Sequence, residues 1–173
     1  QVAKDNGCLI SFDPNLRLSL WKTPEEARRR ILYGMKQCDI MKISEEEVAF
    51  VSEQESLEKG VSFIRDNSDI KILFVTLGNK GSIAYYKDEK IYCGGIHQEH
   101  VVDTTGAGDT FCGAVLSRIL ELGTDALTEK DIREMLLFAN AAASIVVTRK
   151  GALCSMPEPE EIRAASSLID KVL

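Results

Sequence analysis

Cysteine and histidine are too few and too scattered in this 173-residue chain to suggest a metal centre. The five cysteines contain no C-x-x-C pair, and the two histidines flank no cysteine or carboxylate cluster, so no zinc site is expected. An odd number of scattered cysteines is typical of reduced, mostly buried thiols. This usage predicts a cytoplasmic protein.

Clustered basic charge and long apolar runs are also missing. The formal net charge is -6, and the only basic run, residues 28–30, follows two glutamates in a predicted helix. No nucleic-acid partner is expected, because binding to a phosphate backbone needs clustered Lys and Arg. The longest charge-free apolar run, residues 135–148, is too short to span a bilayer and no signal peptide is visible, so no membrane partner is expected.

Two common nucleotide-binding motifs are absent as well. No G-x-G-x-x-G follows the first predicted strand, which disfavours a Rossmann dehydrogenase. No G-x-x-x-x-G-K-[ST] is present, which disfavours a P-loop kinase. The glycine-rich segment of this chain comes late, at residues 106–108.

Strand-like and helix-like segments alternate along the chain. With 45% hydrophobic residues, it can bury roughly 70% of its unfolded surface, and we expect one domain over residues 1–173. Strands are predicted over residues 8–12, 40–43, 71–76, 82–87 and 90–93, with a further extended segment at 99–102. Helices are predicted over residues 1–6, 24–37, 45–52, 56–66, 107–122, 129–147 and 158–171. This order predicts an α/β fold: a three-layer, doubly wound, mostly parallel sheet with an antiparallel edge hairpin.

The most informative segment runs from Asp103 to Phe111 and reads D-T-T-G-A-G-D-T-F. It follows an extended stretch and opens a predicted helix. Gly106 and Gly108 allow the backbone to turn tightly and to approach a ligand closely. The first amides of a helix have no partner within it, so together with the helix dipole they form an anion hole suited to a phosphoryl group.

Asp109 lies one step inside this predicted anion hole. A carboxylate beside a phosphate is electrostatically unfavourable unless it accepts a proton. We therefore interpret Asp109 as a general base that is aimed into the pocket of backbone donors. An isolated G-x-G-D would leave a purely structural role open, because helix dipoles favour acidic residues in first turns and glycines are common before helices.

The nine-residue string resembles the signature of the ribokinase-like (PfkB) carbohydrate kinases, D-T-T-G-A-G-D-x-F. The resemblance implies a ribokinase-like fold and transfer of the γ-phosphoryl group of ATP to a primary hydroxyl of a sugar. In such an enzyme Asp109 is the catalytic base. The amides of Gly106, Ala107, Gly108 and Asp109 then stabilise the migrating charge.

Four further residues resemble residues of the nucleotide site in this family. Thr76, Gly78 and Gly81 match the segment that lines the ribose and phosphates, and Asn140 matches an Asn on the adenine side. Other roles stay open: the first three residues also fit a plain strand-to-hairpin turn, and the alanines after Asn140 also fit close helix packing.

Ser44 and Glu47 occupy the place where the family usually reads N-x-x-E. Ser44 replaces the Asn that contacts the nucleotide phosphates, which shortens the side chain and removes an amide donor. Glu47 keeps the place of the Glu that organises water around Mg²⁺, a cation that prefers carboxylate and water oxygens. The same pair fits a capping box, a role that needs no ligand.

Residues 148–155 resemble the loop that encloses a monovalent cation in many relatives. By position, the resemblance assigns the ligands, mostly through backbone oxygens, to Asp103, Thr105, Val146, Arg149, Gly151 and Ser155. Only Asp103 supplies a charge, which suits K⁺ better than a divalent ion.

The segment Phe12–Arg17 resembles the D-P-N-x-R segment of fructokinases within the family, and the following Leu18–Trp21 also looks fructokinase-like. Asn15 and Arg17 are therefore placed on the substrate and phosphate side. An Arg at the end of a strand can meet phosphate oxygens in bidentate fashion. A type I turn with Arg17 paired to a surface carboxylate stays open as the alternative.

The resemblance covers only the C-terminal part of the family's usual length. We therefore expect the nucleotide-binding and catalytic part of a longer kinase, without the N-terminal sugar-binding Gly-Gly segment and lid, and with little activity as an isolated chain. The expected substrates are ATP and fructose, with ribose, 2-keto-3-deoxygluconate or a nucleoside as alternative acceptors, and a homodimer is expected at full length. A non-catalytic nucleotide-binding module is a further alternative, which Ser44 permits and Asp109 disfavours.

Overall fold

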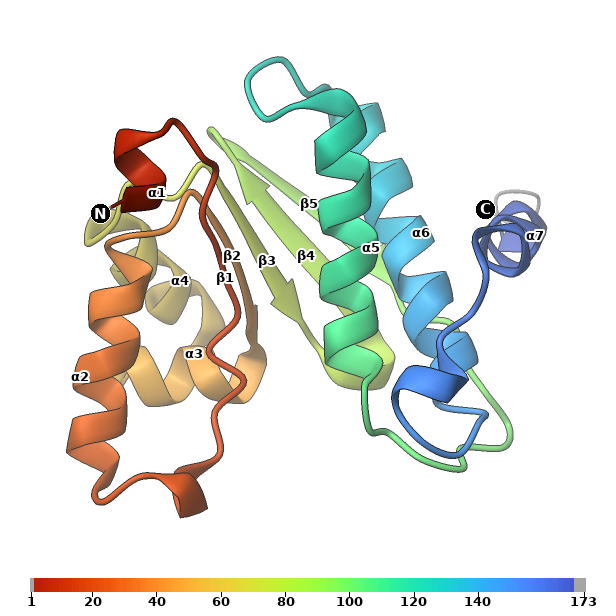
Figure 1. The fold of residues 1–173 in the computed structure, drawn as a ribbon, viewed down its shortest axis with the longest axis horizontal. Coiled ribbons are helices and arrows are strands. Elements are labelled where there is room, and N and C mark those ends of the chain that lie inside the picture. Colours follow the sequence, from red (N-terminus) through yellow and green to blue (C-terminus); the bar gives the residue numbers. More distant parts are fainter. Residues whose placement is uncertain (1, 170–173) are drawn as a thin grey trace. The chain divides into compact units, whose positions relative to one another are not determined.

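The computed structural model of the protein describes residues 2–169, and Figure 1 shows their helices and strands. Five strands are hydrogen-bonded in the order β1-β2-β3-β4-β5, as one mixed sheet. The chain divides into two compact units, one formed by residues 1–76 with 85–88 and the other by residues 77–84 with 89–173. The predicted α/β class is confirmed.

The first unit contains three parallel strands, β1 (Ser11–Phe12), β2 (Ile40–Ser44) and β3 (Ile72–Thr76). Helix α1 (Val2–Asp5) precedes them, α2 (Pro24–Met35) joins β1 to β2, and α3 (Glu45–Ser52) with α4 (Leu57–Asp66) joins β2 to β3. Ser11 lies opposite Ile40, and Ile40 lies opposite Ile72. The residues that follow these strands therefore meet at one edge of the parallel part of the sheet.

Strand β1 is shorter than the five residues predicted for it. The Ile10 amide donates to the side chain of Asp39 at 2.8 Å, and the Ile10 carbonyl accepts from the amides of both Asp39 and Ile40. Because of this irregular pairing, the regular hydrogen-bond ladder between β1 and β2 begins only at Ser11. Cys8 and Leu9 lie before it and are exposed.

The helices of the first unit begin where local capping signals predict. Thr23 caps α2, with Pro24 as the first helical residue, and Ser56 caps α4. The core beneath them is apolar, and it includes the consecutive buried residues 72–75 of β3. In α2, Ala27, Ile31 and Met35 are buried at four-residue spacing. Burial at that spacing is the pattern of a helix with one face packed on a core.

The second unit contains the hairpin and the three C-terminal helices. Strand β4 (Gly81–Tyr86), whose last two residues belong to the first unit, is followed after a two-residue turn by β5 (Glu89–Gly94). Helix α5 (Ala107–Leu122) packs along α6 (Glu129–Val146), and α6 also contacts β5 and α7 (Pro159–Ile169). The predicted hairpin and helices are confirmed, except that residues 170–171 of the last helix lie outside the described residues.

The segment 99–102, expected to be extended, forms no strand in the part of the chain that the structure describes. Its end is held by α6 instead, because the amides of Val102 and Asp103 donate to the carbonyl of Val147 at 2.8 and 3.2 Å. Val147 is the C-cap of α6, so its carbonyl has no partner within the helix. This contact brings the start of the glycine-rich segment to the end of α6.

The expectation of mostly buried thiols is wrong. Cys38 and Cys93 are buried and Cys112 is intermediate, whereas Cys8, in the segment after α1, and Cys154, in the short 3₁₀ helix Leu153–Ser155, are exposed. All five cysteines are free thiols. Among residues 2–169, no helix is both long and apolar enough to cross a membrane.

Candidate active site

Helix α5 begins at the glycine-rich segment, as predicted. Gly106 is its N-cap and has φ +83°, a left-handed conformation that glycine adopts without strain. Within the described chain no side chain caps this helix. The Ala107 amide donates to the carbonyl of Thr104 at 3.3 Å, so one of the predicted anion-hole amides has a backbone partner.

Asp109 lies in the first turn of α5 and is exposed. A carboxylate in this position is favoured by the helix dipole and is accessible to an incoming hydroxyl. The next residue, Thr110, is buried, at 8% exposure. Its hydroxyl has no hydrogen-bond partner among the residues that the structure describes.

Asp103 links the glycine-rich segment to the loop after α6. Its Oδ1 accepts from the Thr105 amide at 2.9 Å, and its Oδ2 accepts from the Gly151 amide at 3.3 Å. These hydrogen bonds, first those from Thr105 and then that from Gly151, lower the pKa of the Asp103 carboxyl from its usual value. Gly106 also faces this loop, since a Cβ on it would lie 3.4 Å from Cα of Ala152.

Of the other predicted cation ligands, Arg149, Gly151 and Ser155 lie in this loop, and Val146 is the last residue of α6. The Ser155 hydroxyl donates to the carbonyls of Gly151 and Ala152 at 2.6 and 2.7 Å. The Arg149 guanidinium donates to the Ser155 carbonyl at 3.4 Å, and the Arg149 amide donates to the Val146 carbonyl at 3.0 Å. The six predicted ligands are thus joined in one network of hydrogen bonds, from Thr105 through Asp103 and the loop to Val146.

In the first unit, Ser44 and Glu47 form the predicted capping box of α3. The Glu47 amide donates to Ser44 Oγ at 3.2 Å, and the Ser44 amide donates to Glu47 Oε2 at 2.8 Å. The other carboxylate oxygen of Glu47 accepts from the Leu16 amide at 2.6 Å. Glu47 is 8% exposed, and its two hydrogen bonds connect the segment after β1 to the start of α3.

Residues 13–17, where a turn was predicted, are irregular backbone after β1, and the hydrogen bond within them is that of an Asx turn. Asn15 has φ +41°, and its amide donates to Asp13 Oδ1 at 3.1 Å. Arg17 is exposed, and its guanidinium donates to the carbonyl of Leu16 at 3.1 Å. Both residues of the predicted substrate side thus lie at the carboxyl end of β1.

Sequence reasoning missed an ion pair at the base of this turn. Lys42 Nζ lies 3.2 Å from Asp13 Oδ2, and the two side chains are only 7% and 16% exposed. Burial raises the pKa of the Asp13 carboxyl, while Lys42 acts in the opposite direction and Glu47 adds to the rise. The signal was available, because Lys42 is the only charged residue in the apolar strand Ile40–Ser44.

Thr76 and the two following glycines lie at the end of β3 and in the turn after it. Thr76 is the last residue of β3 and lies opposite Ser44, so these two predicted nucleotide-site residues end neighbouring strands. Gly78 and Gly81 have φ +59° and +106°. A Cβ on Gly81 would lie 2.2 Å from the Cys93 carbonyl oxygen, so only glycine fits where this turn meets β5.

Asn140 has a packing role in α6. Its Oδ1 accepts from Ser82 Oγ at 2.9 Å, and its Nδ2 donates to the carbonyls of Cys93 and Gly94, both at 3.2 Å. The residue is 7% exposed. Both amide protons are used, and the side chain joins α6 to β4 and to the end of β5.

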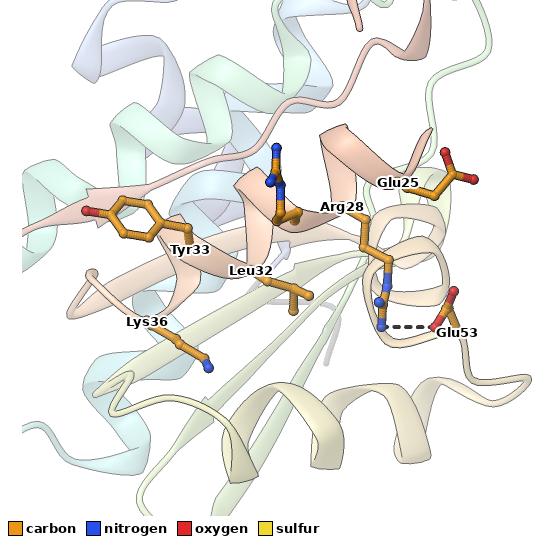
Figure 2. A pocket seen from close by; sticks show the side chains of 7 residues that line it. Glu25, Arg28, Leu32, Tyr33, Lys36 and Glu53 are labelled. Carbon is orange, nitrogen blue, oxygen red and sulfur yellow. Dashed lines mark ion pairs between the residues drawn. The ribbon is translucent and has the colours of Figure 1, made fainter. Parts of the chain in front are cut away.

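A surface groove of about 490 Å³ lies along α2 and contains none of the predicted site residues (Figure 2). Arg28 crosses one end of it, donating to the Val51 carbonyl at 2.8 Å and pairing with Glu53 at 3.0 Å. The groove is lined by Glu25, Arg28, Arg29, Leu32, Tyr33, Lys36 and Glu53.

Residues 1–159 match the model of the pfkB family carbohydrate kinase. The chain belongs to this family. Fructokinase-1 of Oryza sativa subsp. japonica is 42% identical over 164 residues, which are 94% of this chain and 50% of the relative. The chain thus spans about half the length of the curated relatives it matches.

Solved structures give the same assignment. A fructokinase double mutant of Vibrio cholerae O395, in fructose, ADP and potassium ion bound form, is 33% identical with a TM-score of 0.85; the match covers 94% of this chain and 51% of that one. An Escherichia coli protein in complex with ATP and Mg²⁺ is 31% identical with a TM-score of 0.80, over 96% of this chain and 51% of its own. This pfkB chain therefore has the ribokinase-like fold that its signature implied.

Proposed function

We propose that this chain is the nucleotide-binding and catalytic part of a single ribokinase-like domain in an ATP-dependent fructokinase. The observation that carries the proposal is the N-terminus of α5, a glycine-capped helix start with Asp109 in its first turn, in a member of a carbohydrate kinase family. The similarity to fructokinases supports fructose as the acceptor.

Asp109 is the proposed general base. It accepts the proton of the 6-hydroxyl of fructose while that oxygen attacks the γ-phosphorus of ATP, and ADP leaves. The amides of Gly106, Ala107 and Gly108, with that of Asp109, stabilise the charge on the transferring group. This division of roles is supported by the exposed Asp109 carboxylate at a helix start that no described side chain caps.

The nucleotide is proposed to contact residues at the ends of β2 and β3 and in the turn that follows. Ser44 and Thr76 offer hydroxyls on neighbouring strand ends, and Gly78 and Gly81 allow close approach of the backbone. Asn140 is proposed to act by holding β5 in place, since its amide protons are already bonded. Arg17, exposed after β1, is suited to phosphate oxygens, with Asn15 beside it.

Two cations fit the residues present. Glu47 accepts one amide on each oxygen, and each oxygen keeps a lone pair for water bound to Mg²⁺, which when bound would neutralise charge on the phosphates. The network of Asp103, Thr105, Val146, Arg149, Gly151 and Ser155 offers oxygens with one negative charge, which fits K⁺. K⁺ there would hold the loop against Gly106.

An acceptor panel tests the proposed function. The full-length protein, supplied with ATP and Mg²⁺, should phosphorylate fructose with a higher kcat/KM than ribose, 2-keto-3-deoxygluconate or a nucleoside. Nucleotide binding without turnover on any acceptor would contradict the proposal and indicate a non-catalytic module. Light scattering and cell fractionation test the accompanying proposals of a homodimer and of a cytoplasmic location.

A further inference from the structure

A lysine is buried inside β2, on the strand that leads to Ser44. Lys42 is 6% exposed, and the two residues on either side of it, Met41 and Ile43, are fully buried. A buried ammonium is unfavourable unless a counter-charge and hydrogen bonds replace the water it loses. Here the carboxylate of Asp13 supplies both, at 3.2 Å to Oδ2 and 3.4 Å to Oδ1.

The same carboxylate holds the turn after β1. Asp13 Oδ1 accepts from the Asn15 amide at 3.1 Å, so one oxygen serves both the lysine and the turn. Glu47 holds the next residue, because its Oε1 accepts from the Leu16 amide at 2.6 Å. The buried carboxylate of Glu47 and the partly buried one of Asp13 therefore fix two successive backbone amides directly before Arg17.

Charge explains why the lysine is needed at this point. Asp13 and Glu47 repel each other across the turn, and Lys42 is the cation that offsets this repulsion. Without it, Asp13 would be a partly buried carboxylate facing another carboxylate, and it would be displaced towards water. Its loss would release the Asn15 amide and with it the left-handed backbone at φ +41°.

We propose that Lys42 is a positioning residue: through Asp13 it fixes the backbone of residues 13–17 and thereby places Arg17 for contact with phosphate oxygens. The contact between Arg17 and phosphate rests on the proposed function. The link from Lys42 to the turn does not, since it is carried by the hydrogen bonds of Asp13 and Glu47.

Hydrogen exchange in the full-length protein tests the link to the turn. Lys42→Met keeps the length of the side chain and removes the charge, and it should speed exchange in peptides covering residues 13–17 by about 10-fold or more. Lys59→Met, at an exposed lysine of α4, is the matched control and should leave this exchange unchanged. Unchanged exchange in Lys42→Met would overturn the proposal.

A double variant separates positioning from general loss of packing, and it stays informative if Lys42→Met folds poorly. Lys42→Met/Asp13→Asn has no buried charge left unpaired at this pair, and the introduced side-chain amide keeps an oxygen that can accept from the Asn15 amide. Slow exchange should therefore return in the double variant. A double variant that exchanges as fast as Lys42→Met would show that the lysine acts only through packing.

Kinetics test the link from the turn to phosphate. Lys42→Met and Arg17→Ala should each raise the KM for ATP by about 10-fold or more. The combined variant Lys42→Met/Arg17→Ala should have a KM for ATP no higher than that of Arg17→Ala alone. Additive effects would overturn the proposal that Lys42 acts through Arg17. If Arg17→Ala leaves the KM for ATP unchanged, the phosphate role of Arg17 fails, while the exchange data still decide the role of Lys42 in the turn.

Discussion

At the scale of single residues, the candidate site depends on side chains that bond to the backbone. Asp103 accepts from two amides that are far apart in sequence, those of Thr105 and Gly151. Glu47 does the same for the amides of Ser44 and Leu16. Each carboxylate thereby holds two segments of the chain in one arrangement.

The stability of the protein should depend on pH through the carboxyl group of Asp103. Its pKa in the folded chain lies below the ordinary value of 3.8, so its contribution to stability is present above about pH 3.8 and is lost as the pH falls through the lowered pKa. Asp103→Asn should make urea midpoints depend less on pH below 3.8, whereas the exposed Asp69→Asn should not. Parallel profiles for Asp103→Asn and the unaltered protein would contradict this role.

Thr110 should be replaceable by its apolar isostere with a gain in stability. Its hydroxyl is buried without a partner in the described chain, and a buried unsatisfied polar group costs about 1–3 kcal/mol. Thr110→Val should therefore raise the free energy of unfolding by about 1 kcal/mol in urea denaturation. A loss of similar size would show that the hydroxyl is bonded, for instance to a buried water.

At the scale of elements, the sequence was most informative where the signal is local. The starts of α2, α3 and α4 follow from Thr23, Ser44 and Ser56, because a cap bonds to an amide within three residues. The length of β1 could not be predicted, because it depends on Asp39. The same holds for Lys42 and Asp13, which are 29 residues apart and meet only when β1 and β2 pair.

Replacing glycine by alanine should have opposite effects on stability at two helical positions. In α4, a Cβ on the buried Gly60 would lie 2.5 Å from Val48 Cγ1 and 2.9 Å from Ser52 Oγ, so Gly60→Ala should force α3 and α4 apart and cost about 1–3 kcal/mol. In α5, a Cβ on the exposed Gly113 would meet no atom within 4 Å, so Gly113→Ala should stabilise by about 0.5–1 kcal/mol.

Thermal denaturation of both variants measures the difference between these two glycines directly. Equal shifts of Tm in the same direction would contradict the account of packing between α3 and α4, because the change in helix propensity is the same in both variants.

At the scale of the whole molecule, the predicted site residues are distributed over both compact units. The first contains Asn15, Arg17, Ser44, Glu47 and Thr76, and the second contains Gly78, Gly81, Asn140, the glycine-rich segment with Asp109 and the loop proposed for K⁺. The nine-residue signature was enough to predict the family, because its residues act together as one local motif at the start of α5. The roles of Asn140 and Glu47 in holding the fold became visible only with the tertiary contacts.

Asp109 is proposed to take a proton from an alcohol at the start of α5. Replacing it by Asn in the full-length protein keeps the shape of the side chain but removes the base. Fructose phosphorylation should therefore fall by about 10²–10⁴-fold in kcat. Because the loss falls on proton transfer and not on nucleotide binding, the Kd for ATP measured by calorimetry should stay within about twofold. An Asp109→Asn enzyme that keeps most of its turnover would contradict the claim.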